Sequence, residues 1–187
     1  INTCAQYVRT ILSMVLALVA TRVILKSLGV EDYGIYSVVA GAVSILSFLT
    51  SSLVITTQRY LSVSQGKQDT ERSRSIFNNS IFLHVLITVV VVILLEILFV
   101  FLFNGMLNIP ETKIHSAKLL YQFVTVVLCL TFLTSPYRAV VVSHENIVYI
   151  SIIETIDAVL KLLIAYSLFF LSGDKLVIYG ALLMLIQ

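Results

Sequence analysis

The chain has 187 residues, of which 59% are hydrophobic and 12% are charged, and its formal net charge is +2 at pH 7. So few polar residues cannot cover the surface of a soluble domain, and the apolar surplus excludes an intrinsically disordered chain. A net charge this small also makes no basic footprint for nucleic acid. Since a spanning helix needs about 20 apolar residues, we expect a polytopic integral membrane protein with about six helices.

Five apolar stretches are long enough to cross a bilayer, and they predict an all-α bundle of transmembrane helices. The stretches are continuous and too long for barrel strands, in which polar and apolar residues alternate. A sixth apolar run, 176–187, is too short to span. We therefore expect one domain of five complete helices and a truncated sixth, cut from a longer protein. The complete helices are expected at residues 5–25, 33–57, 81–103, 119–135 and 147–171.

The longest polar stretch, residues 62–79, sets the expected orientation in the membrane. It holds Lys67, Arg72 and Arg74, and Arg59 lies just before it. The other connections carry fewer basic residues. The positive-inside rule therefore places this stretch, predicted to be a loop, in the cytoplasm together with the N-terminus.

Three charged residues lie within the fifth expected helix, at positions i, i+3 and i+7: Glu154, Asp157 and Lys161. At about 100° per residue they share one face of the helix. Each charge at the bilayer centre costs about 2.5–3.5 kcal/mol, so this face must turn to the bundle interior or to a water-filled cavity. Asp157 and Lys161 can pair, whereas Glu154 needs another partner, a proton or water. The pattern indicates a transport or ion-coupling site; a salt-bridged polar seam without a transport role is the alternative.

Further charged residues fall within or beside the other expected helices. Arg9 and Arg22 lie in the first helix, and Arg59 lies at the inner end of the second. In a hydrated cavity a guanidinium would bind a phosphate or pyrophosphate group by bidentate hydrogen bonds, so these three arginines are candidate substrate-binding residues. The alternative is that they extend to the lipid headgroups. Glu96 in the third helix is a further intramembrane carboxyl. Either it has a functional role, or it is a neutral or packed side chain without one.

Motifs for enzymatic chemistry are poor in this chain. His144-Glu145 has no second histidine at the spacing of a zinc protease, and there is no G-x-S-x-G or phosphate-binding loop. Cys4 and Cys129 lie in separate expected helices and are interpreted as small apolar residues. The sequence therefore predicts no enzyme activity, no cofactor and no metal.

Several segments are similar to a known family. Residues 22–36, RVILKSLGVEDYGIY, resemble the first helix, loop and second helix of bacterial polysaccharide flippases in the multidrug/oligosaccharidyl-lipid/polysaccharide exporter superfamily. The segments QRYLS at 58–62, GKQD at 66–69, PYRA at 136–139 and SHEN at 143–146 resemble later family segments in the same order. The likeness extends through essentially the whole chain.

This resemblance implies one lobe of a two-lobed transporter with a central cavity and alternating access. The implied substrate is an oligosaccharide on an undecaprenyl pyrophosphate carrier, flipped across the bacterial inner membrane for O-antigen, lipopolysaccharide or capsule synthesis. The implied partners are membrane lipid and polysaccharide polymerase or assembly proteins. In related lipid-carrier flippases, basic residues of the cavity bind the pyrophosphate; by their position, Arg9, Arg22 and Arg59 are the residues expected to do so in this chain.

Three other functions fit parts of the pattern. A cation-coupled multidrug exporter of the same superfamily would use the same intramembrane carboxylates. A membrane-embedded glycosyl or acyl transferase would need an acidic or histidine cluster at the interface, and His144-Glu145 alone comes close. In a membrane scaffold without transport, the charges of the fifth helix would be structural.

Overall fold

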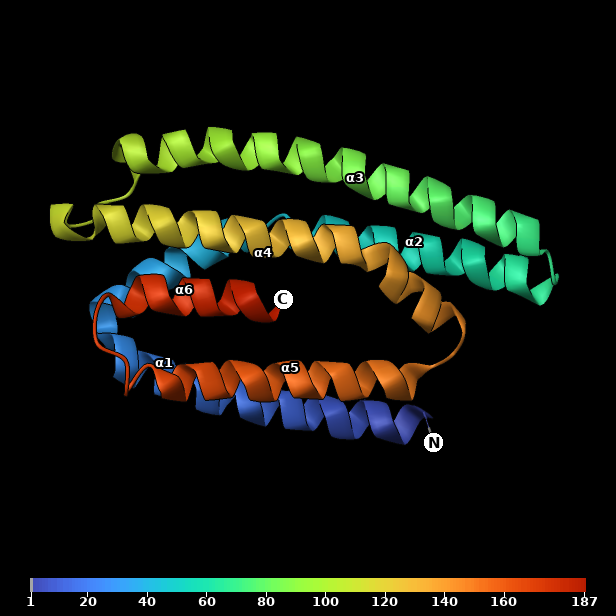
Figure 1. Ribbon diagram of the computed structural model, residues 1–187, viewed down its shortest axis with the longest axis horizontal. Helices are drawn as coiled ribbons and strands as arrows, with labels where there is room; N and C mark the ends of the chain where they lie inside the picture. Colours follow the sequence, from blue (N-terminus) through green and yellow to red (C-terminus); the bar gives the residue numbers. More distant parts are fainter. Residues whose placement is uncertain (1) are drawn as a thin grey trace.

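The computed structural model describes residues 2–187, apart from the side chains of 2–6, 8 and 147. The described chain is all-α, as predicted, and its helices lie nearly parallel to one long axis (Figure 1). The elements in chain order are α1 (Asn2–Ser44), α2 (Ser47–Gly66), α3 (Thr70–Phe101), a π-helical turn η1 (Leu102–Met106), α4 (Glu111–Ser143), α5 (Ile147–Ser167) and α6 (Lys175–Ile186).

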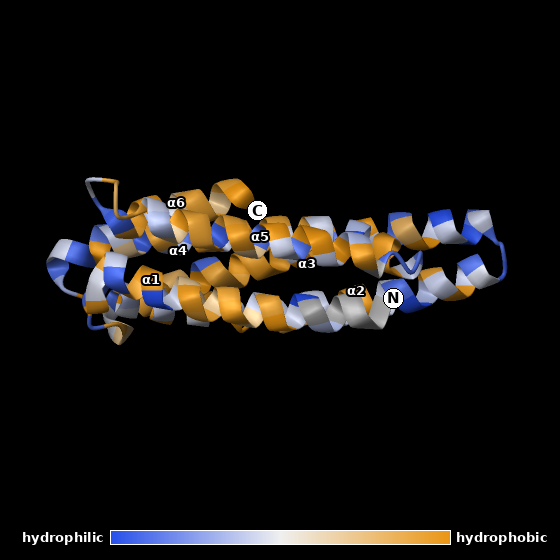
Figure 2. Cartoon of the chain, turned by 90° about the horizontal axis from the view of Figure 1, so that it is seen from below, coloured by the Kyte–Doolittle hydropathy of each residue, from blue (hydrophilic) through white to orange (hydrophobic). Residues whose placement is uncertain are grey.

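Three helical segments are long and apolar enough to cross a membrane by length and composition: Arg9–Ser44, Thr70–Met106 and Glu111–Ser143. Helix α5 has 21 residues but carries three charges, and α6 has only 12 residues, the short sixth helix that the sequence predicts. Apolar residues fill the middle of the bundle and polar residues gather towards its ends (Figure 2). The chain is therefore a multi-pass membrane protein.

Helix α1 contains a sharp kink at Gly29, which has φ 84° and ψ 170°. The kink divides α1 into a first arm, residues 2–28, and a second arm, residues 30–44, at the boundary predicted between the first two helices. The second expected helix, 33–57, is further interrupted at residues 45–46, where Leu46 N–H bonds to the Val43 carbonyl at 3.2 Å. That expected helix is therefore shared between the second arm and α2.

Replacing Gly29 by alanine is expected to lower the free energy of unfolding by about 1–3 kcal/mol, because the backbone conformation at this kink is open only to glycine. An added Cβ would meet nothing within 4 Å, so backbone strain acts alone. Thermal unfolding of the purified protein measures the effect. Gly34→Ala is the matched control, equally open but with helical φ, and it is expected to be neutral or slightly stabilising. Equal losses at both positions would contradict this account.

The polar stretch 62–79 is helical, not the loop that the sequence predicts. Helix α2 continues to Gly66 and α3 begins at Thr70, so only residues 67–69 connect them. Asp69 caps α3, because its carboxylate accepts the Arg72 N–H at 2.9 Å. Polar side chains end a membrane span but do not end a helix, and here they extend both helices into a polar hairpin (Figure 2).

Two other predicted boundaries also differ from the structure. Helix α4 runs from Glu111 to Ser143, well beyond the expected 119–135, and Pro136 kinks it without ending it. Helix α5 ends at Ser167, four residues before the expected boundary. The α4 difference arises because hydropathy reports where the apolar run stops, whereas backbone hydrogen bonding continues through polar turns. Helix α5 instead ends inside its apolar run, where turn hydrogen bonds follow the helix: Phe169 N–H donates to the Tyr166 carbonyl at 3.1 Å, and Phe170 N–H donates to the Ser167 carbonyl at 3.0 Å.

Helix α4 lies at the centre of the larger of two apolar clusters. Its residues Leu120, Tyr121 and Phe132 have no exposed surface and pack between α3 and the second arm of α1. The Tyr121 hydroxyl donates to the Leu95 carbonyl at 2.7 Å, which ties α4 to α3. This cluster forms one layer of the molecule.

A second apolar cluster joins the first arm of α1 to α5 and α6, through Val23, Leu168 and Tyr179. Helix α6 lies between the two layers (Figure 1). It approaches α4 closely at Gly180, where a Cβ would lie 2.8 Å from Leu120 Cδ1. The layers are thus held together along α6.

Candidate functional site

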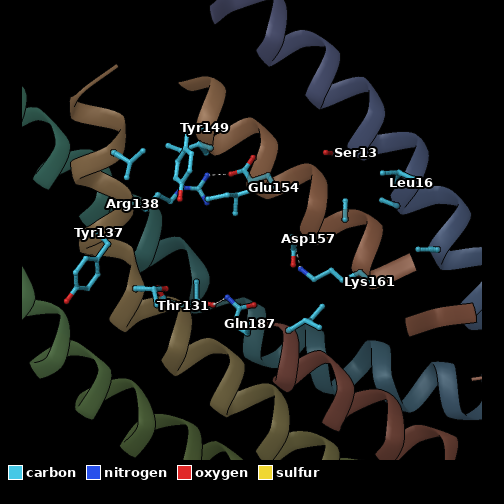
Figure 3. A pocket seen from close by; sticks show the side chains of 18 of the residues that line it. Ser13, Leu16, Thr131, Tyr137, Arg138, Tyr149, Glu154, Asp157, Lys161 and Gln187 are labelled. Atoms are coloured by element: carbon cyan, nitrogen blue, oxygen red, sulfur yellow. Dashed lines mark hydrogen bonds and ion pairs between the residues drawn. The ribbon is translucent and has the colours of Figure 1, made fainter. Parts of the chain in front are cut away.

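A cavity of about 990 Å³ lies between the first arm of α1, α4 and α5, beside the end of α6 (Figure 3). Its apolar wall comes mostly from α1 and from the aliphatic residues of α5. Its polar lining includes hydroxyls, three tyrosines, one amide and four charged groups: Ser13, Thr21, Thr131, Thr134, Tyr137, Tyr149, Tyr179, Gln187, Arg138, Glu154, Asp157 and Lys161.

Pro136 shapes this cavity by bending the last turns of α4 towards α5 (Figure 1). Proline has no N–H, so the Phe132 carbonyl loses its ordinary helical partner. The Ser135 hydroxyl donates to that carbonyl at 2.7 Å and so supplies the hydrogen bond that the proline cannot. The kink therefore leaves no unpaired backbone acceptor and carries Tyr137 and Arg138 to the cavity wall.

One carboxylate connects three helices at this end of the cavity. Glu154 of α5 forms ion pairs with Arg9 of α1 and with Arg138 of α4, one on each carboxylate oxygen. The exposed side-chain fractions are 21% for Arg9, 28% for Glu154 and 53% for Arg138. Two guanidinium charges thus share a single negative charge, and the cluster has a surplus of positive charge.

A second ion pair lies further along the same face of α5. Lys161 Nζ donates to Asp157 Oδ2 at 2.7 Å, and both residues line the cavity (Figure 3). This pair is local to α5 and ties no helices together. The three charged residues of α5 therefore face the interior space, in keeping with the cost of placing charges in lipid.

The structure does not bring the other sequence-predicted site residues to this cavity. Arg22 and Arg59 are exposed on the outside of the bundle and make no hydrogen bond or ion pair with another described residue. Glu96 is also exposed, and it accepts a hydrogen bond from Gln122 Nε2 at 3.3 Å. Arg22 is exposed because of its place on the helix. Its neighbours Val23 and Ile24 are buried against α5 and α6, so the arginine side chain lies on the opposite side of α1.

Sequence analysis misses Arg138 because the expected fourth helix ends at residue 135, three positions before it. The sequence does contain an indication of its position. Pro136 follows a long apolar run, and a proline there can bend a helix without ending it, so Arg138 can still lie on the same helix. Arg9 and Arg22 also carried a signal. They are thirteen positions apart, which at about 100° per residue sets them on nearly opposite sides of one helix.

The far end of the bundle is closed by polar contacts around the N-terminus of α6. Lys113 pairs with the buried Asp32 at 2.9 Å, and Lys175 Nζ donates to the Ser27 carbonyl at 3.3 Å. Asp174 caps α6 and also accepts the Ser116 hydroxyl. Burial by itself would raise the pKa of Asp174, but these hydrogen bonds and the nearby Lys113 cation together hold the pKa below its ordinary value. The contacts fix α6 between the layers.

Metal-ligating groups do not gather in the described part of the chain: no cluster of three or more His, Cys, Asp or Glu residues there could hold an ion. Cys129 is a partly exposed free thiol. The side chain of Cys4 lies outside the described residues. The polar groups of the cavity can therefore offer hydrogen bonds and charge, and the guanidiniums are suited to anions.

These features define a multi-pass helical membrane protein with a charged, partly open cavity between its helices. The chain is 24% identical over 176 residues to the "Uncharacterized membrane protein EpsK" of Bacillus subtilis (strain 168). The alignment covers 94% of this chain and 35% of that protein, so the chain spans about a third of its curated relative. The two are distantly related membrane proteins. No family model and no solved structure matches the chain.

Proposed function

We propose that the protein is a membrane transporter that flips a lipid-linked oligosaccharide across the membrane by alternating access. The observation that carries the proposal is the convergence of Arg9 and Arg138 on one point beside an interior cavity of a multi-pass helical protein. The likeness of residues 22–36 and 136–139 to bacterial polysaccharide flippases supports it. The role involves no enzymatic step and no cofactor.

The cargo is proposed from the chemistry of the cavity. A lipid carrier with a pyrophosphate headgroup needs cationic, bidentate donors, and guanidiniums meet that need better than any other side chain. The sugars need hydroxyl and aromatic contacts, which Tyr137, Tyr149 and Thr134 supply along the wall. At about 990 Å³ the cavity is at the upper end of the range for small-molecule sites, so we propose that it takes the pyrophosphate headgroup and the adjoining sugars, not the whole lipid-linked oligosaccharide.

The orientation follows from the placement of basic residues. The hairpin of α2 and α3 carries Lys67, Arg72 and Arg74, and its end lies beside the end of α4, where Gln65 Nε2 donates to Ser143 Oγ at 3.1 Å. The N-terminus lies towards the same end (Figure 1). We place this end in the cytoplasm of a bacterium, with the protein in the inner membrane, so that the arginine cluster lies nearer the side from which cargo is loaded.

Export of the glycan tests the proposal, using the protein from its complete reading frame in a strain that lacks it. Arg138→Gln is expected to reduce surface glycan more than about tenfold, because a single bidentate charge contact to phosphate is lost. Arg59→Gln, an arginine outside the cavity, is the matched control and is expected to retain export. Equal export by both variants at equal protein levels would contradict the proposed cavity.

A cation-coupled multidrug exporter is the second candidate, because two carboxylates, Glu154 and Asp157, line the same cavity. It predicts drug resistance that depends on these carboxylates, with no change in glycan. A drug phenotype without a glycan phenotype would therefore replace the first proposal with the second.

A further inference from the structure

The two arginines that would bind the cargo are already occupied. Arg9 and Arg138 both pair with Glu154, which lies between them and reaches them from a third helix. Any anion that binds both guanidiniums at this point must take the place of that carboxylate. We propose that Glu154 is an internal placeholder for the phosphate group of the cargo, displaced when the cargo binds and returning when it leaves; this inference rests on the proposed function.

Charge favours the exchange. One carboxylate offers a single negative charge to two guanidiniums, whereas a diphosphate offers more negative charge and more acceptor oxygens to the same two guanidiniums. In the ion-pair cluster beside the cavity, the cations Arg9 and Arg138 outnumber the carboxylate Glu154, whereas Lys161 and Asp157 on the cavity wall neutralise each other. An incoming diphosphate therefore finds a cluster that its own charge can neutralise.

Glu154 also lowers the affinity of the site for that same anion. Binding must break two ion pairs and leave a displaced carboxylate close to the bound phosphate, and both effects cost free energy. Without the carboxylate, two free guanidiniums would hold a diphosphate tightly and release it slowly. A transporter must release its cargo, so a built-in competitor serves turnover at the expense of affinity.

The exchange also changes what joins the helices. Arg138 lies two residues after Pro136, on the bent end of α4, and its ion pair with Glu154 ties that end to α5. When the cargo takes over Arg138, that direct tie is broken and the bent end is held through the cargo. The ion pair of Asp157 and Lys161, being local to α5, is unaffected by such an exchange.

Binding of inorganic pyrophosphate tests the placeholder, measured by titration calorimetry on the purified protein from its complete reading frame. Glu154→Gln keeps a neutral side chain of the same length and removes the competing charge. Its dissociation constant for pyrophosphate is expected to fall about tenfold or more, while cargo export becomes slower. A merely structural role for Glu154 would not tighten binding.

Glu96→Gln is the matched control, because it removes the same charge from α3 outside the cavity, and it is expected to change the affinity by less than about twofold. Glu154→Asp is the second variant in case the first does not fold: its shorter carboxylate reaches the arginines less well, so it is expected to bind pyrophosphate more tightly than wild type. Unchanged or weaker binding in the folded variants overturns the placeholder.

The outcomes separate this inference from the proposed function. If Arg138→Gln leaves glycan export intact, the proposed function of the cavity fails whatever Glu154→Gln does. If Arg138→Gln abolishes export and Glu154→Gln binds pyrophosphate no better than wild type, the transport site stands and the placeholder alone is wrong.

Discussion

Replacing Glu154 by lysine is expected to lower the free energy of unfolding by about 3 kcal/mol, near the lower end of the effect of breaking buried ion pairs. Three cations from three helices would then meet where two guanidiniums now share one carboxylate. The estimate is at the lower end because these side chains are between a fifth and a half exposed, which screens their repulsion. Thermal unfolding in detergent measures the loss.

A compensating substitution distinguishes charge from shape in this test. Adding Arg138→Glu to Glu154→Lys restores two cations and one carboxylate at the same three positions. We expect the double variant to recover most of the lost stability, whereas Arg59→Glu, outside the cavity, gives no recovery. If the double variant is as unstable as Glu154→Lys, the three residues do not act as one electrostatic unit.

Replacing Phe132 by alanine is expected to cost about 3 kcal/mol of unfolding free energy. Its ring has no exposed surface and lies in the centre of the apolar cluster around α4. Lipid tails are as apolar as the cluster, so the loss comes chiefly from the packing contacts that a cavity removes, not from contact with water. The loss would also loosen α4 one turn before the Pro136 kink.

The neighbouring residue is the matched control for this substitution. Leu133 is 41% exposed on the outer side of the same helix, so Leu133→Ala removes few packing contacts. Its expected effect is below about 1 kcal/mol. Similar losses for Phe132→Ala and Leu133→Ala, measured by unfolding in mixed detergent micelles, would contradict the position of the cluster.

Much of the architecture can be predicted from local sequence patterns. The apolar runs predict an all-α membrane bundle, and the kink at Gly29 falls within residues 26–32, the predicted connection between the first two helices. The sequence predicts a loop at the polar hairpin around Asp69, because hydropathy indicates where a membrane span ends and not where the helix ends.

The candidate site was predictable only in part. The shared face of Glu154, Asp157 and Lys161 follows from helical periodicity, and all three line the cavity. The two partners of Glu154 do not follow from the sequence, because Arg9 is 145 residues away and Arg138 lies beyond residue 135, the expected end of the fourth helix. No local pattern ranks Arg9 above Arg22 as that partner until the packed face of α1 is known.

The sequence by itself determined the class of this protein and the one helix that must turn its charges inward, because both depend on the cost of polar groups in lipid, which is a local quantity. Only the tertiary structure decided which arginines meet that helix. The Pro136 kink and the packing of α1 on α5 bring Arg138 and Arg9 to one carboxylate, and contacts between distant segments follow from how helices pack. The low charge content thus identifies a membrane protein, and helix packing decides which of its charged side chains meet at one point.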